Sequence, residues 1–327
     1  ADGAGNTVSA DFTGQTYTIV RLVAALNGAG NLVVDGSRGN SADDLTISFD
    51  GANITISHAS GTLGVSGIAS ASGHGTGTIN IPVAEISGSQ IIFNAGGGDD
   101  TLTIDFGDNS SPFSKQIVFN GQGQTSTDTL ALTGTATFAQ AAFGFSNAND
   151  GSIDVTGNAQ ITYTGLEPIT STITATNVTL NYGASSETIT VTEVVGFPQT
   201  TASSTAGEST TFNNPSGNFT INAGGGDDTI NISDIALAAS LIIDGQTGTN
   251  SAGLTNVSIT ASGNDGLSAS NLSGLTVTGS TFGSNNGDGI VTTDVETISL
   301  TNTNAQNNTS DGVDISAATS VDISGGN

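Results

Sequence analysis

The sequence predicts an all-β protein and, within that class, a right-handed parallel β-helix (a β-solenoid) with about 23 residues per coil in its C-terminal part. Short runs that alternate apolar and polar residues, separated by glycine and aspartate turns, indicate many short strands. Near the C-terminus, Asp265-Gly, Asp288-Gly and Asp311-Gly recur every 23 residues, and apolar positions keep the same step. A repeat this short cannot bury its apolar face alone, so successive coils must stack. The alternative is two β-rich modules followed by a short β-helix.

The expected elements follow the chain in a turn–strand rhythm. Residues 20–26 are mostly apolar and fit either a short helix or a buried strand. Residues 196–216 are rich in Ser, Thr and Pro and are expected to form a surface loop. Strands are expected at 32–34, 45–49, 53–57, 78–83, 91–93, 117–119, 129–132, 153–155, 161–164, 178–180, 188–191, 219–221 and 241–243.

The domain organisation follows from where this rhythm breaks and restarts. Gly165-Leu-Glu-Pro168 interrupts the strands, and the sequence beyond it restarts the earlier pattern. The expected domains are an N-terminal strand or cap region at 1–35, a first β-solenoid module at 36–168, a second, homologous module at 169–250 and regular coils at 251–327.

One stretch occurs twice. Asn94-Ala-Gly-Gly-Gly-Asp-Asp-Thr-Leu-Thr-Ile104 returns as Asn222-Ala-Gly-Gly-Gly-Asp-Asp-Thr-Ile-Asn-Ile232. Each copy lies between two alternating apolar runs, which predicts a strand, a tight turn and a second strand. Glycine accepts the positive φ angles of such turns, and aspartate bonds to its own turn backbone.

The charge excludes several kinds of partner. The chain has 29 acidic residues against only Arg21, Arg38 and Lys115. Nucleic acids and anionic membrane surfaces are therefore not expected as partners, because phosphate contacts need Lys and Arg. No run of 18 apolar residues is present, so no membrane insertion is expected. The absence of cysteine excludes a disulfide framework and thiol chemistry.

The repeated stretch resembles a known calcium-binding repeat. Residues 95–103 and 223–231 match the nonapeptide G-G-x-G-x-D-x-U-x at every defined position but the first. The chain thus resembles the RTX, or haemolysin-type, repeats and the repeat-containing large secreted surface proteins and adhesins. This resemblance implies calcium held between stacked turns, although each motif here stands alone rather than in a tandem array. The implied metal ligands are Asp99, Asp100, Asp227 and Asp228, with Asp128 and Asp244 in the neighbouring turns.

Catalysis is not expected. Gly73-His74-Gly75 is similar to a short motif of β-helical polygalacturonases, but the basic Arg-x-Lys motif of those enzymes is absent. Enzymes on this fold need Lys, Arg, His or Tyr bases, and His58 and His74 are the only histidines. The alternative function is a carbohydrate-binding or polysaccharide-degrading β-helix. Its ligand groove would need aromatic residues, and only three tyrosines are available.

The expected function is therefore a structural or adhesive segment of a secreted, cell-surface protein. The asparagines that precede successive corners are expected to stack and bond along the coils: Asn285, Asn286, Asn307 and Asn308. The last coil, ending at Ile323, is expected to expose unpaired backbone groups. Either the chain continues, or this edge docks head to tail on Thr7–Phe12 or Thr16–Val20 of another copy and builds a filament. Surface glycans are a further expected partner.

Overall fold

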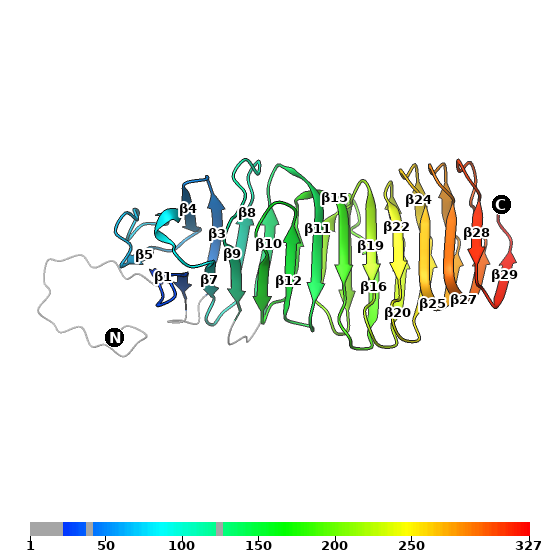
Figure 1. Ribbon diagram of the computed structural model, residues 1–327, viewed down its shortest axis with the longest axis horizontal. Coiled ribbons are helices and arrows are strands. Elements are labelled where there is room, and N and C mark those ends of the chain that lie inside the picture. Colours follow the sequence, from blue (N-terminus) through cyan, green and yellow to red (C-terminus); the bar gives the residue numbers. More distant parts are fainter. Residues whose placement is uncertain (1–21, 37–41, 122–126) are drawn as a thin grey trace, which may run out of the picture. The chain divides into compact units, whose positions relative to one another are not determined.

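A computed structural model describes residues 22–36, 42–121 and 127–327 (Figure 1). Strands make up 54% of the chain and helices 1%, which confirms the all-β class. The docking segments Thr7–Phe12 and Thr16–Val20, and most of the N-terminal region 1–35, lie outside the described residues. Within the described part, no helix has the length and apolar character needed to cross a bilayer.

The chain forms two compact units. Unit 1 takes the residues up to Ala136 together with Gly157–Thr170, and unit 2 takes Thr137–Thr156 with Ser171–Asn327. The expected boundaries at 36, 169 and 251 stay predictions.

The elements of unit 1 are β1 (Leu22–Leu26), β2 (Leu32–Asp35), β3 (Asp44–Phe49), β4 (Asn53–His58), β5 (Leu63–Ser66), β6 (Thr78–Pro82), the 3-10 turn η1 (Val83–Glu85), β7 (Gln90–Asn94), β8 (Thr101–Asp105), β9 (Gln116–Asn120), β10 (Thr129–Thr133) and β13 (Ile161–Thr164). Strand β14 (Ile169–Ser171) contains the point where the chain passes into unit 2. The elements of unit 2 are β11 (Thr137–Phe145), β12 (Gly151–Val155), β15 (Thr174–Asn181), β16 (Thr188–Glu193), β17 (Gln199–Ser204), β18 (Thr210–Asn213), β19 (Asn218–Asn222), β20 (Thr229–Ser233), β21 (Ala236–Leu237), β22 (Ser240–Asp244), β23 (Ser251–Thr255), β24 (Ser258–Thr260), β25 (Leu267–Thr278), β26 (Thr281–Gly283), β27 (Ile290–Thr301), β28 (Val313–Ser316) and β29 (Ser320–Ser324).

Unit 1 is built on two parallel ladders. Strands β3, β8 and β10 pair in register, as do β2, β7, β9 and β13. Leu45, Leu102 and Leu130 occupy equivalent positions in the first ladder, and all three are buried. Alternate residues of each strand face the core, which is why the sequence alternates between apolar and polar.

Unit 2 shows the 23-residue step directly. Leu275 of β25 pairs with Ile298 of β27, which pairs with Val321 of β29. Figure 1 shows these strands side by side at the red end of the chain. Ile298 and Leu300 are at most 3% exposed, so each coil covers the apolar residues of the next. Burial of one such side chain contributes roughly 1.5–3 kcal/mol.

Most of the described strand pairings are parallel, and antiparallel pairs interrupt them, so the sheet contains mixed strands rather than a purely parallel ladder. Antiparallel hairpins leave the ladders at β3–β4 and β16–β17, for example. The turn before β4 is tight, because the Asp50 carboxylate accepts the N–H groups of Ala52 and Asn53. A turn that short can only join antiparallel neighbours.

Two local expectations are also resolved. Residues 22–26 form the strand β1, which pairs antiparallel with β2, so the helix alternative for this segment is wrong. The surface loop expected at 196–216 is wrong as well, because it contains β17 and β18, which pair antiparallel. Ala202 and Phe212, from these two strands, are buried. Their burial stabilises strands in a segment whose Ser-rich and Thr-rich composition suggested a loop.

Candidate functional site

The two glycine–aspartate turns each join one ladder strand to the next, β7 to β8 and β19 to β20. In the second turn, Gly224 and Gly226 have φ angles of 88° and 104°. A Cβ atom at Gly224 would collide with the carbonyl oxygen of Gly183. Only glycine therefore fits here, as the sequence predicted.

The two aspartates of each motif have different surroundings. The first, Asp99 or Asp227, is exposed. The second, Asp100 or Asp228, is only 3% or 1% exposed. The buried aspartate comes directly before a ladder strand, so the ladder aligns it with the equivalent residues of the coils that precede and follow.

In unit 1 this alignment produces a stack of three carboxylates, Asp43, Asp100 and Asp128, which we call the first column. The Asp100 Oδ1 atom accepts the backbone N–H of Asp43 at 2.7 Å. The Asp128 Oδ1 atom accepts the backbone N–H of Asp100 at 2.8 Å. The carboxylates of Asp100 and Asp128 therefore each satisfy a buried N–H of the preceding coil. Leaving such an N–H unpaired would cost about 1–3 kcal/mol.

In unit 2 the equivalent stack is Glu187, Asp228 and Asn250, which we call the second column. The Asp228 Oδ1 atom accepts the N–H of Glu187 at 2.9 Å, and the Asn250 Oδ1 atom accepts the N–H of Asp228 at 2.8 Å. The Asn250 amide also donates to the Gly245 carbonyl at 2.6 Å. The same backbone contact is thus made by a carboxylate in one coil and by a neutral amide in the next.

The first column holds negative charge in a buried place. Burial, together with the neighbouring carboxylates of Asp128, Asp43 and Asp99, raises the pKa of Asp100 to about 6, although the N–H group of Asp43 opposes this shift. Burial also raises the pKa of Asp128, with a contribution from Asp99. The Oδ2 atoms of Asp100 and Asp128 are buried and have no hydrogen-bond partner among the described residues. A carboxyl group in that position favours its neutral form.

The pKa values of the carboxyl groups in the second column are shifted in the same direction. Burial raises the pKa values of Asp228 and Glu187, and the charges of Asp227 and Asp228 respectively add to these shifts. The Ser204 hydroxyl donates a hydrogen bond to Glu187, which opposes the shift of that group. The third member, Asn250, carries no charge.

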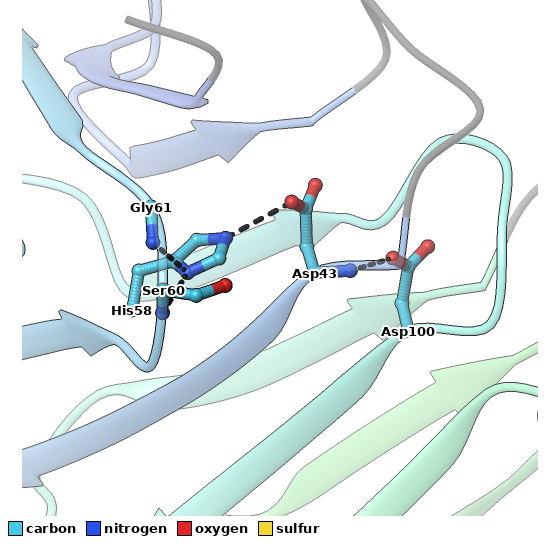
Figure 2. A network of polar contacts seen from close by, with 5 residues as sticks. All are labelled: Asp43, His58, Ser60, Gly61 and Asp100. Carbon is cyan, nitrogen blue, oxygen red and sulfur yellow. Dashed lines mark hydrogen bonds and ion pairs between the residues drawn. The ribbon is translucent and has the colours of Figure 1, made fainter.

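A histidine extends the first column on the side of Asp43 (Figure 2). The His58 Nε2 atom lies 3.0 Å from Asp43 Oδ1, and both residues are buried. The Nδ1 atom accepts the N–H groups of Ser60 at 3.1 Å and Gly61 at 2.8 Å. Because Nδ1 accepts, the proton of a neutral His58 is on Nε2 and points to Asp43. Both ring nitrogens are therefore engaged in holding the turn after β4.

The columns do not provide a calcium shell. Calcium takes six to eight oxygen ligands. In the described residues, no three His, Asp or Glu side chains are grouped so that they could hold a metal ion. Asp227 Oδ1 accepts the N–H of Thr249, and one oxygen of Asp100, Asp128 and Asp228 is likewise used by the backbone. The donors present do not fit the ion, and calcium binding at these aspartates stays a prediction.

The structure brings some of the expected site residues together and leaves others apart. Asp100 and Asp128 are adjacent members of one column. Asp244 belongs to a different corner, where its Oδ1 accepts the N–H of Gln246 at 2.9 Å and the Asn271 amide at 2.7 Å. His74 lies exposed in a turn and accepts the N–H of Val65 through Nδ1.

Sequence reasoning missed Asp43, His58, Glu187 and Asn250 as partners. A signal for two of them was present, because Asp43 and Glu187 precede Asp44-Leu-Thr-Ile and Thr-Ile-Thr-Val as Asp100 precedes Thr-Leu-Thr-Ile. No pattern in the chain indicated that the ring of His58 lies against Asp43.

The predicted asparagine stacking is confirmed for two of the four residues. Asn285 Oδ1 accepts the N–H of Ser262 at 3.1 Å, and Asn308 Oδ1 accepts the N–H of Asn285 at 3.0 Å. These bonds repeat the geometry of the columns. In these coils of unit 2, as in the columns, a side-chain oxygen accepts the N–H of the preceding coil.

Comparison with known proteins identifies no relative of this chain. No family model, no curated protein and no solved structure matches this chain.

Proposed function

We propose that this chain is a structural and adhesive segment of an extracellular, cell-surface protein, folded as a right-handed parallel β-solenoid with hairpin excursions. In this proposal the protein performs no catalysis. Copies associate head to tail through their coil edges.

The observation that carries this proposal is how the polar side chains are used. Asp100, Asp128 and Asp228 look like site residues in the sequence, yet each gives an oxygen to a backbone N–H of the preceding coil, as Asn250 also does. Side-chain oxygens that accept backbone N–H groups hold the coils in register, and few polar groups then remain to act on a substrate. This use of side chains favours a scaffold.

The absence of catalysis is supported by the cations and histidines. The Lys115 ammonium donates to the carbonyl oxygens of Ile86 and Gly88 at 2.9 and 2.6 Å. His58 is buried with both nitrogens engaged. Arg21 and Arg38 lie outside the described residues. Assays on neutral and acidic polysaccharides should detect no turnover. Turnover that is abolished by His74→Ala or Asp100→Ala would overturn this part of the proposal and favour the carbohydrate-active alternative.

The association surface is the edge formed by β28 and β29. Val321 and Ile323 are 45% and 60% exposed, while the residues at the same positions one coil earlier, Ile298 and Leu300, are 3% and 2% exposed. A further coil would cover these two side chains as β29 covers β27. We assign that coil to a second copy of this chain, with a continuation of the same chain as the alternative, because an uncovered strand edge pairs with another strand.

Sizing of the purified chain over a dilution series tests this assignment. The native protein should shift to larger species as its concentration rises, and Ile323→Asp should remain monomeric. Ser324→Asp places the same charge on the outward side of β29 and should associate like the native chain. A native protein that is monomeric at every concentration excludes assembly through this edge.

Surface location needs a separate experiment. Antibodies against the purified chain should label intact source cells without permeabilisation. Label that appears only after permeabilisation would contradict an extracellular role. The acidic charge and the absence of cysteine agree with this location but do not require it.

A further inference from the structure

One outward face of unit 2 forms a regular grid. Six strands pair in parallel and in register: β16, β20, β23, the C-terminal halves of β25 and β27, and β29. Their outward residues therefore fall into three rows that run across the strands. The first row is Thr188, Thr229, Ser251, Gly274, Thr297 and Ser320; the second is Thr190, Asn231, Gly253, Thr276, Ser299 and Asp322; the third is Thr192, Ser233, Thr255, Thr278, Thr301 and Ser324.

The grid is chemically uniform. Hydroxyl residues fill five of six positions in the first row, three of six in the second and all six in the third. It contains no lysine, arginine or aromatic residue, and Asp322 is its one acid, although the whole chain carries a net charge of −26. The acids of this unit lie mostly at the corners, so this face is neutral within an acidic protein.

The hydroxyls of the grid are largely free to bind something outside the protein. Thr229, Thr255 and Thr276 are exposed, and within the described residues their hydroxyls make no hydrogen bond to the protein. The exceptions are Thr297, which donates to the Ser273 carbonyl, and the pair Thr301 and Ser324, whose hydroxyls lie 3.4 Å apart.

Another outward face of unit 2 behaves differently. There, the Asn222 amide of β19 donates to the Asn181 side-chain oxygen of β15 at 2.7 Å. At this position the side chains of two neighbouring coils bond to each other. The hydroxyl face instead leaves its bonding capacity unused, which is the property expected of a binding surface.

The spacing of the grid is set by the strands. Neighbouring strands lie about 4.8 Å apart, and alternate residues along one strand are separated by roughly 6.7 Å. Only a partner that repeats in two dimensions can contact every position of such a grid at once. We propose that this hydroxyl grid is a binding face for ice, the crystalline form of water. Water oxygens on ice faces repeat at distances of similar size.

Other periodic partners fit the face less well. An anionic surface would need Lys or Arg, and a calcium mineral would need carboxylates. A crystalline polysaccharide presents apolar ring faces that bind best to aromatic side chains, and the grid has none. Binding to ice requires only rigid, neutral groups that donate and accept hydrogen bonds. Threonine also carries a methyl group, which excludes disordered water. The inference holds whether or not copies assemble end to end.

An ice-affinity experiment tests this proposal. Fluorescently labelled full chain is mixed with an inert protein of similar size, and ice is grown slowly from the solution. The native chain should be enriched in the ice, and Thr276→Tyr, which raises a bulky ring from the centre of the grid, should reduce that enrichment to the inert level. Thr255→Tyr is a second grid variant in case the first fails to fold.

The matched control is Thr220→Tyr, an outward position of β19 on the other face, which should bind ice like the native chain. All variants are first compared by melting temperature. Exclusion of the native chain from ice overturns the proposal, as does equal enrichment of a folded grid variant. Binding to crystalline cellulose with no enrichment in ice would also overturn it and assign the face to a polysaccharide.

Discussion

The two columns are built around two nearly identical sequence motifs, and they differ in charge. Asp100 and Asp228 occupy the same place in the two motifs and make the same bond to the preceding coil. Asp128 follows in the first column and Asn250 in the second. The first column therefore stacks three carboxylates, while the second ends in an amide that donates its own hydrogen bond to Gly245.

This difference shows which property of the side chain the fold needs. The backbone requires an oxygen acceptor at the corner, and both Asp and Asn supply one. The negative charge is not required by that contact, and in a buried stack it is unfavourable. We therefore expect the composition of the second column to be the more stable one, and exchanges of residues between the columns test this expectation.

The largest effect is expected for Asn250→Asp. This change gives the second column a third carboxylate, removes the bond to Gly245 and places negative charge beside a carbonyl oxygen. We expect a loss of roughly 3 kcal/mol at pH 7, measured by urea unfolding. Much of the loss should be recovered at pH 4, where the new carboxyl is protonated. A variant as stable as the native chain at pH 7 would show that the columns tolerate charge and would remove the basis of the comparison.

The pH dependence of the native chain is the next largest effect. Because the pKa of Asp100 is raised to about 6, the folded state holds this proton more tightly than the unfolded state, whose pKa is about 4. The stabilisation is fully present below about pH 4 and is lost as the pH rises through 6, with a contribution of up to about 3 kcal/mol. Unfolding experiments in steps from pH 4 to pH 7 should show that the stability of the native chain falls as the pH rises. Asp100→Asn should remove this part of the pH dependence. If native and variant have parallel pH profiles, Asp100 titrates normally.

A smaller effect is expected for Asp128→Asn, which gives the first column the composition of the second. The amide oxygen still accepts the N–H of Asp100, while the charge next to Asp100 disappears. Stability at pH 7 should rise by about 1 kcal/mol, and the pH dependence should become shallower because the pKa of Asp100 falls. Destabilisation by this change would mean that the carboxylate of Asp128 has a partner that requires its charge.

Much of the fold was predictable because it depends on local patterns. The alternation of apolar and polar residues located most strands, and the step from Asp265 to Asp288 predicted the pairing of β25 with β27. The hairpins were not predicted, because a strand has the same alternation of apolar and polar residues whether its neighbour is parallel or antiparallel. Residues 196–216 were misjudged because their composition is that of a loop while their burial is that of strands.

The site was predictable only in part. The glycine turns and the importance of Asp100 and Asp228 followed from the sequence, since few residues fit such a turn. The role of these aspartates did not follow, because a carboxylate that binds calcium and one that accepts an N–H have the same sequence signal. Their partners Asp43 and Glu187 lie 57 and 41 residues away, a separation that only the ladder register determines.

The central claim is that the buried aspartates of the motifs are backbone acceptors, and Asp100→Asn tests it most directly. Asparagine keeps the acceptor for the Asp43 N–H and removes the charge that a calcium ligand would need. Melting of the native chain and of this variant is compared at pH 7 with chelator, with calcium and with magnesium. The account predicts that the variant melts at or above the native temperature and that none of the additions shifts either protein. A variant that melts lower, together with a native chain that chelator destabilises and calcium but not magnesium restores, would contradict it and establish the calcium site.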